Sequence, residues 1–317
     1  MVATGAVEGP RAGSTSLGSM SLPDAPFGRM LTAMVTPFGD DGSVDLDGVS
    51  RVADHLVRNG NDGLVVSGTT GESPTTTVEE DGQILAAVKD AVGGRATIVA
   101  GVGTNSTAHS VELAEQASKV GVDAILLVAP YYSKPSQAGL LAHFGRVVEA
   151  ADLPTMLYDV PGRTGTAIAL DTYERARRWE QVVAVKDATG DLVRAARLVD
   201  LGYSVYSGDD AATLGFLAHG GCGLVSVVGH VAGRELAAMV TSFLDGDHGA
   251  ALDTFTRLLP AFDAVMGVPN YGATTAKAGL QLTGVLDNRN VRGPLVPLDE
   301  DELAALRSGL ESAGLLA

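Results

Sequence analysis

The sequence is poor in cysteine, in basic residues and in long hydrophobic runs, and each shortage excludes a class of protein. Its 317 residues include one cysteine, Cys222, so the chain can form neither an internal disulfide nor a cysteine-ligated zinc site. Basic residues number 22 and acidic residues 38, and the net charge of −16 argues against a nucleic-acid or anionic-membrane partner. No run of about 18 apolar residues occurs, so we expect no membrane span and a cytoplasmic location.

The two parts of the chain differ in composition. Residues 1–26 are small, polar and rich in Gly, Ser and Pro, without the continuous apolar segment of a secretory signal. We interpret them as a flexible leader. The chain as a whole is 45% hydrophobic, which is too apolar for disorder and sufficient for a large core.

From Met30 onward, short apolar runs alternate with helix-like stretches. The runs begin at Met30, Gly63, Thr97, Ala124, Pro154, Val182, Ser204 and Gly223. They are continuously apolar, which is typical of parallel strands covered on both faces. No G-x-G-x-x-G follows the first run, where a dinucleotide-binding sheet would carry it. The pattern predicts an α/β fold, a (β/α)8 TIM barrel over residues 27–231, followed by a C-terminal helical region over 232–317 that packs on the barrel.

Polar residues gather where these runs end. The ends include GTTGE at 68–72, YY at 131–132, YD at 158–159, KD at 186–187 and SGDD at 207–210. In barrels of this kind, the loops at the carboxyl ends of the strands carry the active site. We therefore predict a site at this rim.

Lys186 is the most informative residue at the rim. The chain has only five lysines, and Lys186 is the one that ends an apolar strand, VVAVK. Burial of an ammonium is costly and favours the neutral amine, which is the nucleophile needed to form a Schiff base with a carbonyl substrate. A salt bridge between Lys186 and Asp187, or another acid at a strand end, is the alternative that the residues leave open.

Other rim residues suit the same chemistry, although each alone also fits a structural role. The phenol of Tyr158 could relay protons, and the guanidinium of Arg163 could bind a carboxylate. The GTTGES loop offers backbone N–H groups and hydroxyls to a small carboxylate or phosphate. The six histidines show no metal-binding spacing, and Asp209-Asp210 alone is a weak metal signal, so we expect no metal or separate cofactor.

Five motifs together resemble the dihydrodipicolinate synthase family of pyruvate-dependent class I aldolases. They are GTTGES at 68–73, PYYSKPSQAGLLAHF at 130–144, YDVPGRTG at 158–165, VVAVKDATGD at 182–191 and SGDD at 207–210. The resemblance extends from about Met30 to the C-terminus. It implies a lyase that condenses pyruvate with L-aspartate 4-semialdehyde to 4-hydroxy-tetrahydrodipicolinate, in the diaminopimelate route to lysine, through an imine with pyruvate.

The resemblance implies a catalytic role for each of four residues. Lys186 matches the lysine that forms the imine, and Tyr158 matches the tyrosine that relays protons. Thr69 matches the threonine that links Tyr158 to a second tyrosine, which Tyr132 matches. Because a neighbouring subunit contributes that second tyrosine in the family, the resemblance also implies a homo-oligomer, a tetramer built as a dimer of dimers.

Three further residues match positions that bind substrate in the family. Thr70 matches the threonine that holds the pyruvate carboxylate, and Val225 matches the residue whose backbone carbonyl faces the bound ketoacid. Arg163 matches the arginine that binds the carboxylate of aspartate semialdehyde. The chain departs from the pattern at Asp159, where many members have Asn.

Two other functions remain open at this point. One is a related aldolase acting on N-acetylneuraminate or on 2-keto-3-deoxy sugar acids, and the other is a non-catalytic barrel that binds keto acids. Thr69-Thr70, Tyr132 and Arg163 match the synthase pattern, whereas neuraminate-specific members carry Ser before the second Thr. Intact Lys186 and Tyr158 favour an enzyme.

The resemblance also bears on regulation by lysine, which binds some members at a subunit interface. The matching positions here are Ser73, Pro74, Val78, Asp81, Asn105, His109 and Tyr131. Val78 and Asp81 replace histidines, and His109 replaces the glutamate that would face the ammonium of lysine. An imidazole offers that ammonium no countercharge, so we predict weak inhibition or none.

Overall fold

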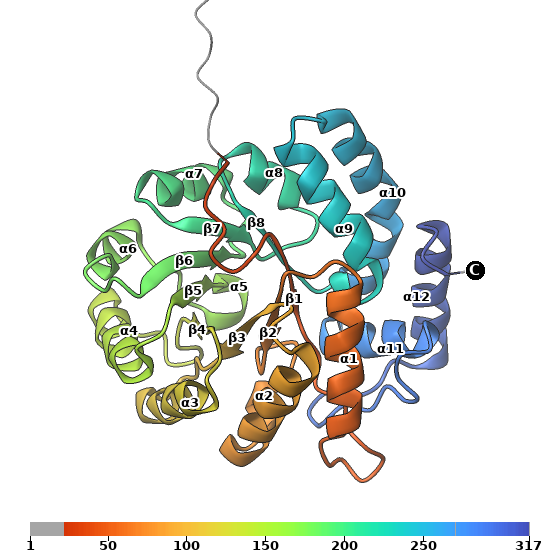
Figure 1. The fold of residues 1–317 in the computed structure, drawn as a ribbon, viewed down its shortest axis with the longest axis horizontal. Coiled ribbons are helices and arrows are strands. Elements are labelled where there is room, and N and C mark those ends of the chain that lie inside the picture. Colours follow the sequence, from red (N-terminus) through yellow and green to blue (C-terminus); the bar gives the residue numbers. More distant parts are fainter. Residues whose placement is uncertain (1–21, 270, 317) are drawn as a thin grey trace, which may run out of the picture.

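The computed structural model describes residues 22–269 and 271–316. Of the leader expected over residues 1–26, positions 1–21 lie outside the described residues. Eight parallel strands form a closed barrel in sequence order (Figure 1). They are β1 (Met30–Ala33), β2 (Gly63–Val66), β3 (Thr97–Gly101), β4 (Ala124–Val128), β5 (Thr155–Asp159), β6 (Val182–Asp187), β7 (Ser204–Ser207) and β8 (Gly223–Ser226). The predicted TIM barrel is confirmed, and each strand begins within one residue of the predicted position.

Helices connect the strands and surround the barrel (Figure 1). They are α1 (Leu46–Arg58), α2 (Val78–Val92), α3 (Thr107–Val120), α4 (Gln137–Ala151), α5 (Pro161–Thr164), α6 (Leu170–Ala176), α7 (Leu192–Asp200) and α8 (Thr213–Ala218). Local sequence fixes their ends. The Thr77 side chain accepts from the Glu80 N–H, and the Glu80 carboxylate accepts from the Thr77 N–H, so a capping box starts α2. Gly93 ends α2 with a positive φ of 57°.

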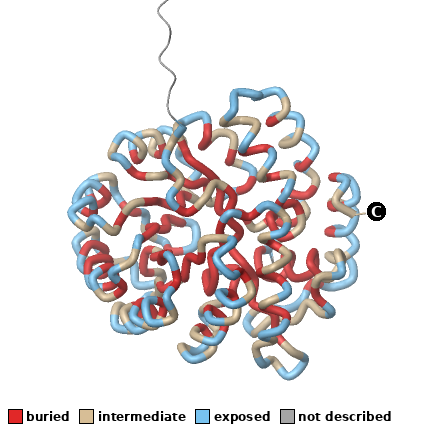
Figure 2. Tube along the Cα trace, in the orientation of Figure 1, coloured by how far each residue is buried: buried red, intermediate tan, exposed pale blue. Residues whose placement is uncertain are grey.

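The buried side chains of the barrel form two layers, as expected for strands whose successive side chains point to opposite faces. Figure 2 shows the buried residues concentrated in the centre of the molecule. One cluster, which includes Met156, Tyr158 and Ala184, fills the interior of the barrel. A larger cluster, which includes Leu157 and Val185, joins the outside of the barrel to the helices. This alternation decides which polar residues at the strand ends face the cavity.

The predicted C-terminal helices are also confirmed. They are α9 (Gly229–Leu244), α10 (His248–Met266), α11 (Ala273–Leu282) and α12 (Glu300–Ser312). Their apolar faces form a separate cluster that includes Met30 of β1 and Leu224 of β8, so this region packs on the barrel where the first and last strands meet. Within residues 22–269 and 271–316, no helix has the length and hydropathy needed to cross a membrane.

Candidate active site

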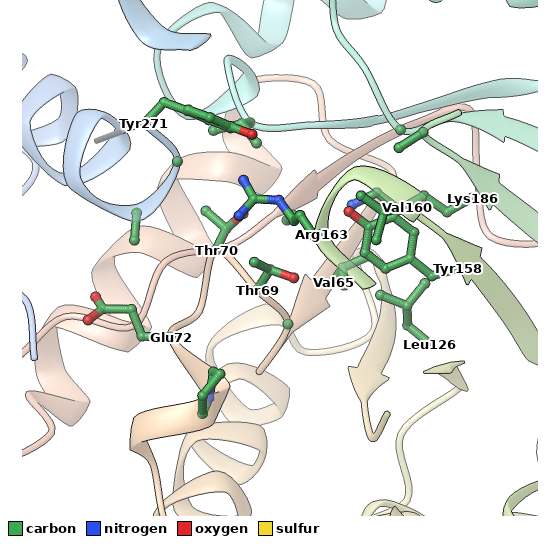
Figure 3. Close-up of a pocket in the computed structure, with 18 of the residues that line it drawn as sticks. Val65, Thr69, Thr70, Glu72, Leu126, Tyr158, Val160, Arg163, Lys186 and Tyr271 are labelled. Atoms are coloured by element: carbon green, nitrogen blue, oxygen red, sulfur yellow. The ribbon is translucent and has the colours of Figure 1, made fainter. Parts of the chain in front are cut away.

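A cavity of about 480 Å³ lies at the carboxyl ends of the strands, where the sequence predicts the site. Its walls come from the loop after β2, from the ends of β5 and β6, and from the loops after β7 and β8. The C-terminal region contributes part of the wall. Among the lining residues are Thr69, Thr70, Glu72, Tyr158, Arg163, Lys186, Asp209, Tyr271, Ala273 and Leu295 (Figure 3).

Lys186 and Tyr158 lie side by side in this cavity. They are register partners in the β5–β6 pair, and the Lys186 Nζ is 4.3 Å from the centre of the Tyr158 ring (Figure 3). Burial lowers the pKa of the Lys186 amine to about 8, although the Asp210 carboxylate acts in the opposite direction. With a pKa of about 8, roughly a tenth of the amine is neutral and nucleophilic at pH 7, far more than for an exposed lysine.

The salt bridge between Lys186 and Asp187, which the sequence left open, does not form. Asp187 points away from the barrel interior, and its Oδ1 accepts hydrogen bonds from the backbone N–H and the hydroxyl of Thr189, at 2.8 and 2.7 Å. Its nearest cation is Arg194, with the Nε at 3.9 Å. That interpretation was wrong because adjacent residues of a strand face opposite sides of the sheet.

Arg194 joins the outer faces of the two strands that carry Lys186 and Tyr158. Its guanidinium forms an ion pair with Asp159, which also accepts a hydrogen bond from the Tyr173 hydroxyl at 3.3 Å. Burial raises the pKa of the Asp159 carboxyl, and the nearby Arg194 acts in the opposite direction. Asp159 therefore has a structural partner outside the barrel and does not enter the cavity.

The Tyr158 phenol is suited to donate a proton or pass one on. Its ring is 6% exposed, and burial raises the pKa of the phenol to about 12, against the effect of the Arg163 charge. The hydroxyl therefore stays protonated near neutral pH. In Figure 3 it faces the part of the cavity that holds Thr69.

The loop after β2 presents two adjacent threonines to the cavity. The Glu72 N–H donates to the Thr69 carbonyl at 3.1 Å, and the Ser73 N–H donates to the Gly68 carbonyl at 3.3 Å, which closes a compact turn. The Thr70 side chain is buried against the cavity wall, whereas Thr69 is exposed. Two hydroxyls and the surrounding N–H groups suit a small carboxylate.

Arg163 lies at the mouth of the cavity, on the short helix α5. Its guanidinium packs on the ring of Tyr271, with the Cζ 4.9 Å from the ring centre. Sequence reasoning missed Tyr271, because it lies 108 residues further along the chain in a loop without a recognised motif. A cation–π contact holds the guanidinium in place while its N–H groups remain free to meet an anion.

Two predicted residues lie apart from this cavity. Tyr132 is 89% exposed, with a left-handed φ of 73°, and lines a neighbouring cavity of about 360 Å³. That cavity shares Thr69, Tyr158 and Arg163 with the first. Val225 is buried in the barrel interior on β8 and lines neither cavity.

The two acids after β7 have different surroundings: Asp209 lines the cavity and Asp210 does not. Asp210 is buried, and its carboxylate accepts from the Ser226 hydroxyl and from the N–H groups of Val227 and Val228. It thereby ties the end of β7 to the loop after β8. Over the described ranges, no group of three or more His, Cys, Asp or Glu side chains is arranged to hold a metal ion.

A buried ion pair was also missed by sequence reasoning. Glu72 lines the cavity, and the Lys277 Nζ lies 2.5 Å from its Oε1. Lys277 sits in the segment TTAKAGLQL, where a lysine would ordinarily be on the solvent face of a helix. Glu72 was missed because the GTTGES motif was interpreted through its threonine hydroxyls and backbone N–H groups.

Comparisons with known proteins agree with this geometry. The profile of the "Dihydrodipicolinate synthetase family" matches residues 26–313. The 4-hydroxy-tetrahydrodipicolinate synthase of Acidothermus cellulolyticus is 54% identical over 297 residues, covering 93% of this chain and 95% of the relative. The Streptomyces coelicolor 4-hydroxy-tetrahydrodipicolinate synthase 2 is 50% identical, covering 93% and 98%.

Solved structures show the same fold. The dihydrodipicolinate synthase of Bacillus anthracis is 41% identical with a TM-score of 0.86, covering 90% of this chain and 98% of the other. The enzyme of Cyanidioschyzon merolae, solved with lysine bound, is 39% identical with a TM-score of 0.88, covering 92% and 100%.

Proposed function

The chain belongs to the dihydrodipicolinate synthetase family, and on this basis we propose which of its residues carry out the reaction. It is a lyase that condenses pyruvate with L-aspartate 4-semialdehyde to give 4-hydroxy-tetrahydrodipicolinate, in the diaminopimelate route to lysine. The reaction passes through a covalent imine between pyruvate and a lysine, and it needs no separate cofactor.

The observation that carries the assignment is the position of Lys186. Its amine is buried on the inner face of the barrel, beside Tyr158, and no carboxylate of the described chain forms an ion pair with it. The neutral amine attacks the carbonyl carbon of pyruvate, and loss of one water gives the imine. The other buried lysine, Lys277, is already paired with Glu72 and lines neither cavity.

The remaining steps need protons to be moved near the imine. Loss of a proton from the pyruvate methyl carbon gives an enamine, which attacks the aldehyde carbon of the second substrate while the aldehyde oxygen takes a proton. The amino group of the semialdehyde then displaces Lys186 and closes the ring. We assign the proton transfers to the Tyr158 phenol, which stays protonated near neutral pH and lies next to the amine. Thr69 extends this path from the cavity towards the neighbouring cavity.

Two carboxylates need to be bound, and two residues are placed to bind them. We assign the pyruvate carboxylate to Thr70, which lies buried in the compact turn after β2. We assign the semialdehyde carboxylate to Arg163 at the cavity mouth, where Tyr271 orients the guanidinium. We assign to the backbone carbonyl of Val225, on β8, the position facing the bound ketoacid that the family resemblance implies.

We also propose a homo-oligomer, a tetramer built as a dimer of dimers, in which Tyr132 completes the site of a neighbour. The exposure of Tyr132 beside a second cavity supports this assembly. A cytoplasmic location suits the one buried cysteine, Cys222. We assign the chemistry to residues 27–231 and a supporting role to residues 232–317.

A substrate panel tests the function. The purified protein is assayed with pyruvate and L-aspartate 4-semialdehyde, with N-acetylneuraminate, and with 2-keto-3-deoxygluconate. We expect turnover with the first pair alone. Faster turnover of either sugar acid would assign the chain to a different branch of the aldolases, and binding of pyruvate without any turnover would indicate a non-catalytic barrel.

A further inference from the structure

A buried ion pair connects the C-terminal region to the loop that carries Thr69 and Thr70. The Lys277 Nζ on α11 donates to Glu72 Oε1 at 2.5 Å, and both side chains are 1% exposed. The two residues are 205 positions apart in the sequence. Glu72 lines the active-site cavity, two residues after Thr70.

Glu72 is held firmly at both its backbone and its side chain. Its backbone has a left-handed φ of 58°, which is unfavourable for a residue with a side chain and requires support from its surroundings. Its N–H closes the turn to the Thr69 carbonyl, and its Oε2 accepts from the Arg292 N–H at 2.9 Å. The residue that closes the turn is therefore also held through its carboxylate.

Lys277 is fixed just as firmly from the C-terminal side. Its Nζ also donates to the Asn290 carbonyl at 2.7 Å and lies 4.2 Å from the centre of the Phe38 ring. Burial lowers the pKa of this amine to about 8, while the Glu72 charge acts to raise it. The ammonium is thus shared between the loop after β2, the loop after β1 and the segment after α11.

Attachment of the C-terminal region to the barrel does not explain this pair. Arg292 already provides that attachment, because its guanidinium donates hydrogen bonds to both Glu80 oxygens at 2.9 and 2.6 Å and to the Thr75 carbonyl at 2.8 Å. A buried ion pair also adds little net stability compared with apolar packing, because its desolvation is costly. What the pair does provide is a fixed orientation of the Glu72 side chain beside the cavity.

We propose that Lys277 is a positioning residue for pyruvate binding: by holding Glu72, it fixes the turn that presents Thr70 to the pyruvate carboxylate. The proposal rests on the proposed role of Thr70. It also gives the C-terminal region a part in the site, because α11 follows directly after Tyr271, the residue that packs on Arg163.

Steady-state kinetics of Lys277 variants test the proposal. Lys277→Met should raise the KM for pyruvate about tenfold or more, since small displacements of a binding group are costly, while kcat at saturating pyruvate changes little. Lys277→Arg should restore part of the affinity. In Glu72→Gln/Lys277→Met no charge is left buried, so its thermal stability should exceed that of Lys277→Met, while its KM stays high.

Arg289→Met is the matched control. Arg289 holds the same C-terminal segment, through the Leu298 carbonyl and the Gln281 side chain, but it does not touch the loop after β2. It should lower the unfolding temperature without changing the KM for pyruvate. An equal rise in KM for Arg289→Met and Lys277→Met would overturn the proposal. If Lys277→Met does not fold, the KM for pyruvate is measured for Lys277→Arg and Glu72→Asp, which keep both charges. A raised KM supports the proposal, and wild-type KM values in both variants would overturn it.

Borohydride trapping separates this proposal from the proposed function. In Lys277→Met, saturating pyruvate should still label Lys186, with half-maximal labelling shifted about tenfold or more to higher pyruvate, like the KM. Half-maximal labelling at the wild-type concentration would contradict the positioning role alone. A wild-type protein that is not labelled at Lys186 would contradict the proposed function itself.

Discussion

Lys186 and Tyr158 are register partners on adjacent parallel strands, and the amine of one lies 4.3 Å from the ring centre of the other. Each is followed by an aspartate, Asp187 or Asp159, which faces the opposite side of the sheet and Arg194. The sheet therefore separates the reactive amine from two nearby carboxylates that would otherwise pair with it. Burial of the Lys186 amine is the main cause of its lowered pKa, and the Asp210 carboxylate acts in the opposite direction.

Replacement of Tyr158 by Phe tests the proton relay. The ring keeps its packing in the barrel interior, but the group that moves protons is lost, so kcat should fall about 100-fold or more. The circular dichroism spectrum should not change. The control is Tyr203→Phe, which removes a hydroxyl that donates to the Tyr173 carbonyl and should leave kcat unchanged. Normal turnover by Tyr158→Phe would rule out the relay.

Tyr132 provides a test of the oligomer. Tyr132 is 89% exposed, has a left-handed φ and lines a cavity that Tyr158 also lines. Such a side chain is suited to be covered by another subunit. Sedimentation should give a mass several times the chain mass of 32.3 kDa. Tyr132→Ala should lower kcat, whereas Leu252→Ala, at another exposed apolar position, should not. A monomer with full activity would contradict this assembly.

The burial of His230 predicts that the protein loses stability in mild acid. Its Nε2 accepts from the Val35 N–H at 3.1 Å and its Nδ1 lies 2.7 Å from the Val227 carbonyl, so the neutral ring joins the segments after β1 and β8. Burial lowers its pKa from 6.5 to about 4. The unfolded chain therefore binds a proton that the folded chain rejects, and stability falls as the pH drops from about 6.5 to about 4, by at most about 3 kcal/mol.

Urea denaturation between pH 7 and pH 4.5 measures this effect. The wild-type free energy of unfolding should fall more steeply with decreasing pH than that of His230→Gln, which cannot titrate. His219→Gln, at an exposed histidine just after α8, is the control and should follow the wild type. Parallel curves for the wild type and His230→Gln would exclude the contribution of His230.

Lysine should inhibit this enzyme weakly or not at all. His109 is half-buried, with its Nδ1 3.4 Å from Glu112 Oε2, and its side chain offers no carboxylate to an ammonium. The Asp81 carboxylate is buried and accepts from the Thr76 hydroxyl at 2.9 Å, and burial raises its pKa to about 6. Activity titrated with L-lysine to millimolar levels should stay nearly flat, and His109→Glu should increase the inhibition. A sigmoidal curve for the wild type would refute this prediction.

Local sequence was sufficient to predict the barrel and the place of the candidate site at its rim. The eight apolar runs and the polar residues at their carboxyl ends determine the fold and the position of Lys186, because strand alternation and barrel topology are regular. The Glu72–Lys277 pair could not be predicted, since it depends on packing between segments 205 residues apart. Tyr271 was missed for the same reason. The pairing of Lys186 with Asp187 was left open because the apolar run alone does not show which face each residue takes.

The most direct test of the account is to identify the lysine that forms the imine. The protein is incubated with pyruvate, reduced with borohydride and digested, and the peptides are analysed by mass spectrometry. We expect the mass of reduced pyruvate on the peptide that contains Lys186, and none on the peptide that contains Lys277, whose amine is paired with Glu72. Labelling of Lys277 or of any lysine other than Lys186, or no labelling, would contradict the account.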